Sequence, residues 1–126
     1  MLRHPGGVGD DDFLTALSEA LVLCGISMSV AGDSRPASGA CHEISHAFDL
    51  LFPKRNALHG EQCGLGGAFA TYLRGDHTMA RQMAEVLRRH GLPVLPEEIG
   101  FTADEFVQVM EFAPQTRPGR FTILEH

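Results

Sequence analysis

The segment from Phe13 to Val30 constrains the fold more than any other part of the chain. Aspartates at positions 10 to 12 precede it and can cap and charge-stabilise the start of a helix, and Gly32 follows it as a helix stop. Its apolar residues occupy all sides of this helix instead of one stripe. A helix of that kind is normally enclosed by other elements. We therefore predict a long central helix with the rest of the domain packed around it.

Four further helices are predicted downstream, and no pair of strands is convincing. Their predicted ranges are 40–52, 59–74, 78–90 and 102–113. The third helix carries four glycines, each of which costs about 1 kcal/mol relative to alanine in a helix interior. Its tolerance of glycine indicates either close packing against its backbone or a ligand pressed against it. The fold class predicted is all-α, a compact bundle of about five helices over residues 11–126, after a flexible N-terminus at 1–10.

Composition excludes several classes of partner. Ten Lys and Arg residues stand against sixteen Asp and Glu, and the net charge of −6 argues against nucleic acid or an anionic membrane as a partner. The three cysteines form no CxxC pair and are typical of reduced thiols. We see no signal peptide, and the longest apolar run, from Ala20 to Met28, is too short to span a bilayer. We expect a soluble, cytoplasmic protein.

Three histidines stand at spacings that a metal site could use. His42 and His46 are four residues apart on one predicted helix, and His59 opens the next helix. Two adjacent helices that each present an imidazole could hold a divalent cation between them, although a catalytic zinc normally takes three protein ligands. Cys41 and Cys63 could complete a mixed site, but small buried apolar residues are the favoured interpretation of both. The histidines could also simply hydrogen-bond to backbone or carboxylate groups.

Four segments together resemble a known family. They cover residues 31–39, with Ser-Arg-Pro-Ala-Ser-Gly, residues 42–49, with two spaced histidines, residues 57–64, with His-Gly-Glu-Gln, and the tail 117–124. With these motifs the chain resembles the C-terminal part of the glycerol-1-phosphate dehydrogenases, in the dehydroquinate synthase-like and iron-containing alcohol dehydrogenase superfamily. The resemblance runs from about residue 11 to the end. Any one of the motifs alone would be weak, and their combination is specific.

The resemblance implies a two-domain enzyme. An α/β domain binds NAD(P), and a helical domain carries zinc or a related divalent cation that polarises the carbonyl of dihydroxyacetone phosphate during hydride transfer. In the family this cation is held by one aspartate and two histidines. By position the two histidine ligands correspond to His42 and His59, whereas His46 corresponds to a histidine near the site and is our candidate catalytic residue. A satisfied core histidine is an equal alternative for His46.

Two further pairs of residues are candidates for the same site. Ser34 and Arg35 are expected to bind substrate, since a guanidinium is suited to a phosphate group, although Arg35 could instead pair with Asp33 or Asp49. Glu61 and Gln62 are expected to orient a histidine ligand. The favourable interaction of a carboxylate with the N-terminus of a helix explains a glutamate at position 61 nearly as well.

The departures from the family are large. The nucleotide-binding domain and the aspartate ligand are expected to lie outside this chain, so no residue here is assigned to cofactor binding. Cys41 stands where the family usually has glutamate. One hypothesis is therefore a metal-binding domain that works with a separately encoded nucleotide-binding half on a small phosphorylated substrate, and that forms a homo-oligomer through its exposed apolar face. The alternative is a truncated or repurposed helical domain that acts as a binding module without catalysis. Genomic context, in the form of a neighbouring reading frame for the missing half, would separate the two.

Overall fold

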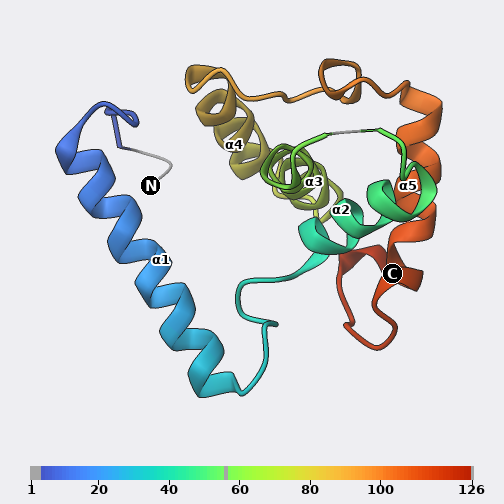
Figure 1. Ribbon diagram of the computed structural model, residues 1–126, viewed down its shortest axis with the longest axis horizontal. Coiled ribbons are helices and arrows are strands. Elements are labelled where there is room, and N and C mark those ends of the chain that lie inside the picture. The colour runs from blue at the N-terminus through green and yellow to red at the C-terminus, as the bar shows by residue number, and fades with distance from the viewer. Residues whose placement is uncertain (1–3, 56, 126) are drawn as a thin grey trace. The chain divides into compact units, whose positions relative to one another are not determined.

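The structure, a computed structural model, describes residues 4–55 and 57–125, which form helices joined by loops, with no strand among them. The predicted all-α class is confirmed. The helices in order are α1 (Asp11–Ala31), α2 (Ala40–Leu51), α3 (His59–Leu73), α4 (His77–Arg89), the 3-10 turn η1 (Pro96–Ile99), α5 (Ala103–Thr116) and the 3-10 turn η2 (Ile123–Glu125) (Figure 1). Residues 1–3 of the predicted flexible N-terminus lie outside the described residues.

The chain divides into two compact units, Met1–Ser38 and Gly39–His126, and each is described by itself. Helix α1 forms most of the first unit. Asp10 caps it by accepting a hydrogen bond from the Phe13 N–H at 2.9 Å, and Gly32 ends it in the left-handed conformation with φ of 73°. Both signals were correctly read from the sequence.

The prediction that α1 is a central helix is wrong for the unit in which it lies. Phe13 is its buried residue, while large apolar side chains along the helix are exposed: Leu14, Leu21, Val22, Leu23, Ile26 and Val30. The physical reason is that α2 to α5 belong to the other unit. By length and composition α1 is long and apolar enough to cross a membrane. The inference from sequence that no apolar segment is long enough to do so is therefore corrected. An apolar core helix of a soluble protein meets the same criteria, so this property assigns no location.

The second unit is built around α2. This helix packs against α3 on one side and α5 on another, and α3 in turn packs against α4 (Figure 1). Its buried core is apolar and aromatic: Ile44, Ala47, Phe48, Leu65, Ala70, Phe101, Phe106, Val109 and Ala113. Because α2 packs against both neighbours and buries Ile44 and Phe48 in the core, this packing positions the first turn, which carries the candidate ligand His42.

The glycines of α3 bring its backbone close to α2 and α4. A Cβ added at Gly66 would lie 3.0 Å from the Cγ2 atom of Ile44, which is fully buried on α2. Additions at Gly64 and Gly67 would meet Leu87 and Met83 of α4 at 3.0 and 3.3 Å, whereas Gly60 faces open space. Close packing of the helix backbone, as predicted, therefore accounts for three of these glycines.

Candidate metal centre

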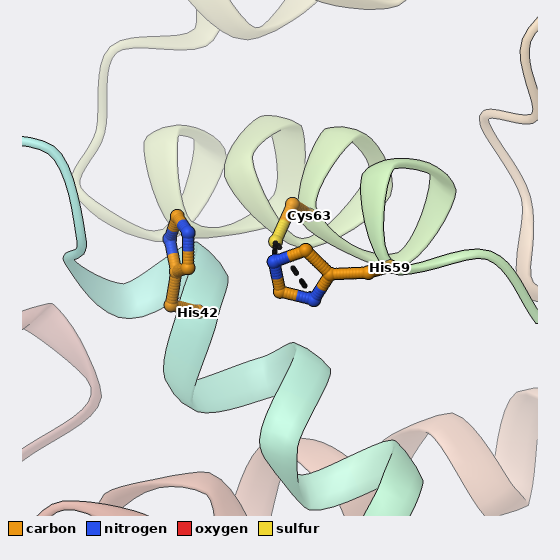
Figure 2. Close-up of side chains that lie close together, drawn as sticks. All are labelled: His42, His59 and Cys63. Atoms are coloured by element: carbon orange, nitrogen blue, oxygen red, sulfur yellow. Dashed lines mark hydrogen bonds between the residues drawn. The ribbon is translucent and has the colours of Figure 1, made fainter.

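The structure brings His42 and His59 together between α2 and α3. His42 lies in the first turn of α2 and His59 is the first residue of α3, and their ring centroids are 5.2 Å apart with the ring planes inclined at 62° (Figure 2). The α2–α3 contact positions them, because Gly66 lets the two helices approach closely. Ring nitrogens so arranged can converge on one cation.

A chain of hydrogen bonds determines which nitrogen of the His59 ring carries the proton. The Asp49 carboxylate only accepts hydrogen bonds, so the Gln62 amide nitrogen faces it at 3.1 Å and the Gln62 oxygen faces Ser45. Ser45 donates its hydroxyl proton to that oxygen at 2.5 Å and therefore accepts from His59 Nδ1 at 2.7 Å. The proton of His59 is thereby placed on Nδ1, and the lone pair on Nε2 is left to bind a cation.

The same chain shows what sequence reasoning found and missed. Gln62 was expected to orient a histidine, and here it faces His59 through Ser45. Ser45 was not predicted to belong to the site, and Asp49 was considered only as a partner for Arg35, although the i, i+4 spacing between Ser45 and Asp49 indicates one face of α2. Glu61 lies elsewhere: its carboxylate accepts from the Leu58 N–H at 3.4 Å and caps α3. That position fits the alternative of a favourable helix N-terminal charge.

Both neighbouring cysteines contact the histidine pair. Cys63 stands one turn after His59, with its Sγ atom 3.5 Å from His59 Nε2, and ligand atoms of His42, His59 and Cys63 all lie within 4.8 Å of one another. Cys41 Sγ is 3.2 Å from His42 Nδ1. A hydrogen bond between the thiols lowers the pKa of Cys41 to about 5 and raises that of Cys63. Both side chains are partly exposed, so the expectation of small buried apolar residues does not describe them fully.

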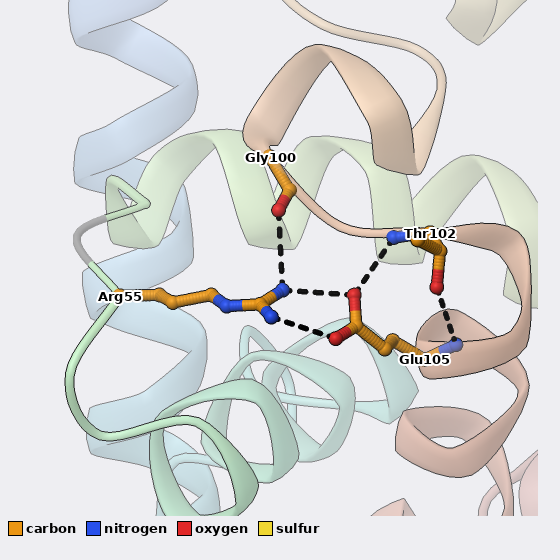
Figure 3. Close-up of polar contacts among 4 residues, drawn as sticks. All are labelled: Arg55, Gly100, Thr102 and Glu105. Carbon is orange, nitrogen blue, oxygen red and sulfur yellow. Dashed lines mark hydrogen bonds and ion pairs between the residues drawn. The ribbon is translucent and has the colours of Figure 1, made fainter.

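An ion pair fixes the loop that leads into α3. The Arg55 guanidinium donates two hydrogen bonds, of 2.7 and 2.8 Å, to the Glu105 carboxylate and a third, of 3.2 Å, to the Gly100 carbonyl (Figure 3). Glu105 also completes a capping box with Thr102 at the start of α5. The hydrogen bonds from Arg55 are the main reason that the pKa of Glu105 falls to about 2. The start of α3 is thus tied to the start of α5.

The C-terminal segment returns to α2 beside the histidines. Arg117 donates a hydrogen bond of 2.7 Å to Nε2 of His46, and Thr122 donates one of 2.6 Å to the buried carboxylate of Glu43. Because arginine has no acceptor, His46 is neutral and carries its proton on Nδ1. Burial, and secondly the charge of Arg117, lower the pKa of His46. Its ring centroid lies 6.4 Å from that of His59, and Arg117 was not predicted to belong to this site.

Comparison with known proteins identifies the family. The chain is 43% identical over 116 residues to glycerol-1-phosphate dehydrogenase [NAD(P)+] of Staphylothermus marinus and 43% identical over 117 residues to that of Pyrococcus furiosus. By sequence, the chain belongs to the glycerol-1-phosphate dehydrogenase family. It spans about a third of these relatives, since the alignments cover 92% and 93% of the chain but 32% and 33% of the two enzymes. No protein-family model matches it.

The family membership confirms the resemblance drawn from the four motifs, and the matching third is the C-terminal one. A relative from Methanoregula boonei, 44% identical over 109 residues, matches 86% of the chain and 30% of its own length. Residues 31–38 of the first motif belong to the first unit, and the three histidines belong to the second. Within the first unit Arg35 pairs with Asp33 at 3.6 Å, as the alternative interpretation of that arginine anticipated.

Proposed function

We propose that the chain is the metal-bearing helical domain of a glycerol-1-phosphate dehydrogenase-like oxidoreductase. The observation that carries the proposal is the convergence of His42 and His59, at the positions that the family resemblance assigns to its histidine ligands. Their neighbourhood fits a cation, since the Nε2 lone pair of His59 is available. We propose zinc or a related divalent cation as the group held there.

The reaction proposed is the NAD(P)-dependent reduction of dihydroxyacetone phosphate. A cation at this site would supply Lewis-acid chemistry, polarising the substrate carbonyl. In this scheme His42 and His59 hold the cation, and Ser45 and Gln62 keep the His59 ring in its binding orientation. We propose that His46, neutral with its proton on Nδ1, donates a hydrogen bond to the substrate oxygen, and that the proton of the product hydroxyl comes from solvent.

Substrate and partner assignments are part of the same proposal. Arg35, with Ser34 beside it, would bind the substrate phosphate by exchanging its contact with Asp33 for one with the phosphate oxygens. The dinucleotide would bind on a separately encoded nucleotide-binding half. We further propose a cytoplasmic homo-oligomer, in which a second copy covers exposed apolar residues of α1 such as Val22 and Ile26.

A chimaeric enzyme tests the proposed function. The C-terminal third of the Pyrococcus furiosus relative, which aligns with the chain at 43% identity, would be replaced by residues 11–126. We expect the chimaera to oxidise NADH with dihydroxyacetone phosphate, and the His42→Ala and His59→Ala versions to fold, bind NADH and lose turnover. A chimaera that folds and binds NADH but turns over equally with both histidines removed would contradict the proposal and favour a binding module without catalysis.

A further inference from the structure

Two thiols face each other across the contact between α2 and α3. Cys41 lies in the first turn of α2, and Cys63 lies in the second turn of α3. The Sγ atom of Cys41 is 3.2 Å from Nδ1 of His42, and the Sγ atom of Cys63 is 3.5 Å from Nε2 of His59 (Figure 2). Because the centroids of these two rings are 5.2 Å apart, both sulfurs lie beside the same pair of imidazoles.

The packing of the two helices brings the cysteines within reach of each other. Gly67 follows Cys63 by four residues, and residues at that spacing share one face of a helix. A Cβ added at Gly67 would lie 3.7 Å from the Cβ of Cys41, so Cys41 packs against the face of α3 that carries Cys63. A hydrogen bond joins the two thiols. From this contact, rotation of the side chains can bring the sulfurs to the disulfide bond length of about 2.05 Å.

Both thiols can also be reached from solution. The side chains of Cys41 and Cys63 are partly exposed, and both cysteines are free, so the structure describes the reduced state of the pair. The third cysteine, Cys24, is exposed on α1 and belongs to the other unit. Inside the unit that contains α2 and α3, an oxidised Cys41 or Cys63 therefore has the other as its thiol partner.

We propose that Cys41 and Cys63 form a reversible disulfide that links α2 to α3 beside the two histidines, with a small disulfide such as oxidised glutathione as the oxidant. One cysteine sulfur attacks the glutathione disulfide, forms a mixed disulfide and releases one reduced glutathione. The second cysteine sulfur attacks the mixed disulfide, so that the protein S–S bond forms and the second glutathione leaves. The two protein thiols lose two electrons and two protons in all, and both glutathione molecules leave as thiols.

The link would alter the surroundings of the histidine pair. Each sulfur contacts one imidazole in the reduced chain, at His42 and at His59, and bonding of the sulfurs to each other changes both contacts. Intracellular disulfides in mesophilic proteins are usually transient and redox-sensing, and a reversible bond at this position fits that use. The inference does not depend on a cation between the helices.

A glutathione redox titration of the full chain in the presence of a chelator tests the pair. Free thiols would be alkylated after denaturation and located by peptide mass spectrometry. We expect the oxidised wild type to keep one alkylated thiol, at Cys24, and to yield a peptide pair that joins Cys41 to Cys63 and separates on reduction. The Cys24→Ser variant is the matched control and should form the same link. Cys41→Ser and Cys63→Ser should stop at a mixed disulfide between glutathione and the remaining cysteine of the pair.

The unfolded chain shows whether the fold brings the thiols together. The folded wild type should form the link at a [GSH]²/[GSSG] ratio at least about tenfold higher than the chain in concentrated urea. Equal midpoints in the folded and unfolded chains would overturn the proposal. So would an oxidised wild type in which Cys41 and Cys63 both remain free or both stop at mixed disulfides, or one that forms disulfides mainly through Cys24. Since no metal is present in this experiment, its failure would leave the two-histidine site untouched.

Discussion

Two adjacent glycines of α3 should respond in opposite directions to the same substitution. Replacing a helix-interior glycine by alanine gains about 0.8–1.0 kcal/mol from backbone entropy alone. At Gly67 the new Cβ would meet the flexible end of Met83 at 3.3 Å, and the methionine can move aside. We therefore expect Gly67→Ala to raise the free energy of unfolding by about 0.5–1 kcal/mol.

At Gly66 the new Cβ has no room. It would lie 3.0, 3.1 and 3.2 Å from Cγ2, Cβ and Cδ1 of Ile44, against ordinary contacts of 3.4–4 Å, and Ile44 has an exposed fraction of 0%. Overpacking of a filled core typically costs about 1–3 kcal/mol, which exceeds the gain in helix propensity. Gly66→Ala should therefore lower the free energy of unfolding by about 0–2 kcal/mol, which makes it less stable than Gly67→Ala by about 0.5–3 kcal/mol.

Thermal and urea unfolding followed by far-ultraviolet circular dichroism would measure this difference. We expect the two variants to differ in Tm by on the order of 5–15 °C, with Gly66→Ala the less stable. In an Ile44→Ala background, which removes two of the three close atoms, Gly66→Ala should cost about 1 kcal/mol less than in the wild type. Equal stability of the two alanine variants, or additive effects with Ile44→Ala, would refute the account of how α2 and α3 are brought together.

Three further predictions concern the Glu105 carboxylate, the Ser45 hydroxyl and the binding of NADH. The free energy of unfolding should fall as the pH is lowered from about 4.5 to about 2, because the pKa of Glu105 is lowered in the folded chain and protonation of this carboxylate favours unfolding. The Glu105→Gln variant should be less stable than the wild type at pH 7, and its free energy of unfolding should depend less on pH in that range. Ser45→Ala should weaken zinc binding about 10- to 100-fold in calorimetry while the helix content is kept, because His59 loses its acceptor at Nδ1. The isolated chain should show no binding of NADH by calorimetry; micromolar affinity would contradict the assignment of the dinucleotide to a separate half.

Helix positions were predictable wherever local chemistry decides them. Asp10 and Gly32 mark the ends of α1, and the Thr102–Glu105 box marks the start of α5, because capping depends on neighbouring residues alone. The prediction that α5 ends before Pro114 was too short, since the helix runs to Thr116. A proline in the last turn lacks the backbone N–H and crowds the carbonyl four residues before it, but it does not prevent the next two residues from staying helical.

Tertiary placement was not predictable from local pattern. An apolar helix such as α1 looks the same in sequence whether or not its own unit supplies packing partners, and within its own unit most of the large apolar side chains of α1 are exposed. Similarly, motif position indicated His42 and His59, but the acceptor role of Ser45 depends on the contact of α2 with α3. Arg117 reaches His46 across 71 residues of sequence, a separation at which side-chain pairing leaves no periodic signal.

The most direct test of the metal centre is zinc affinity, measured by calorimetry at pH 7.5 in the wild type, His42→Ala and His59→Ala. The wild type should bind one zinc ion per chain, and each histidine variant should bind it at least about a hundredfold more weakly. Equal affinity in all three proteins would contradict the claim that these two histidines hold a metal.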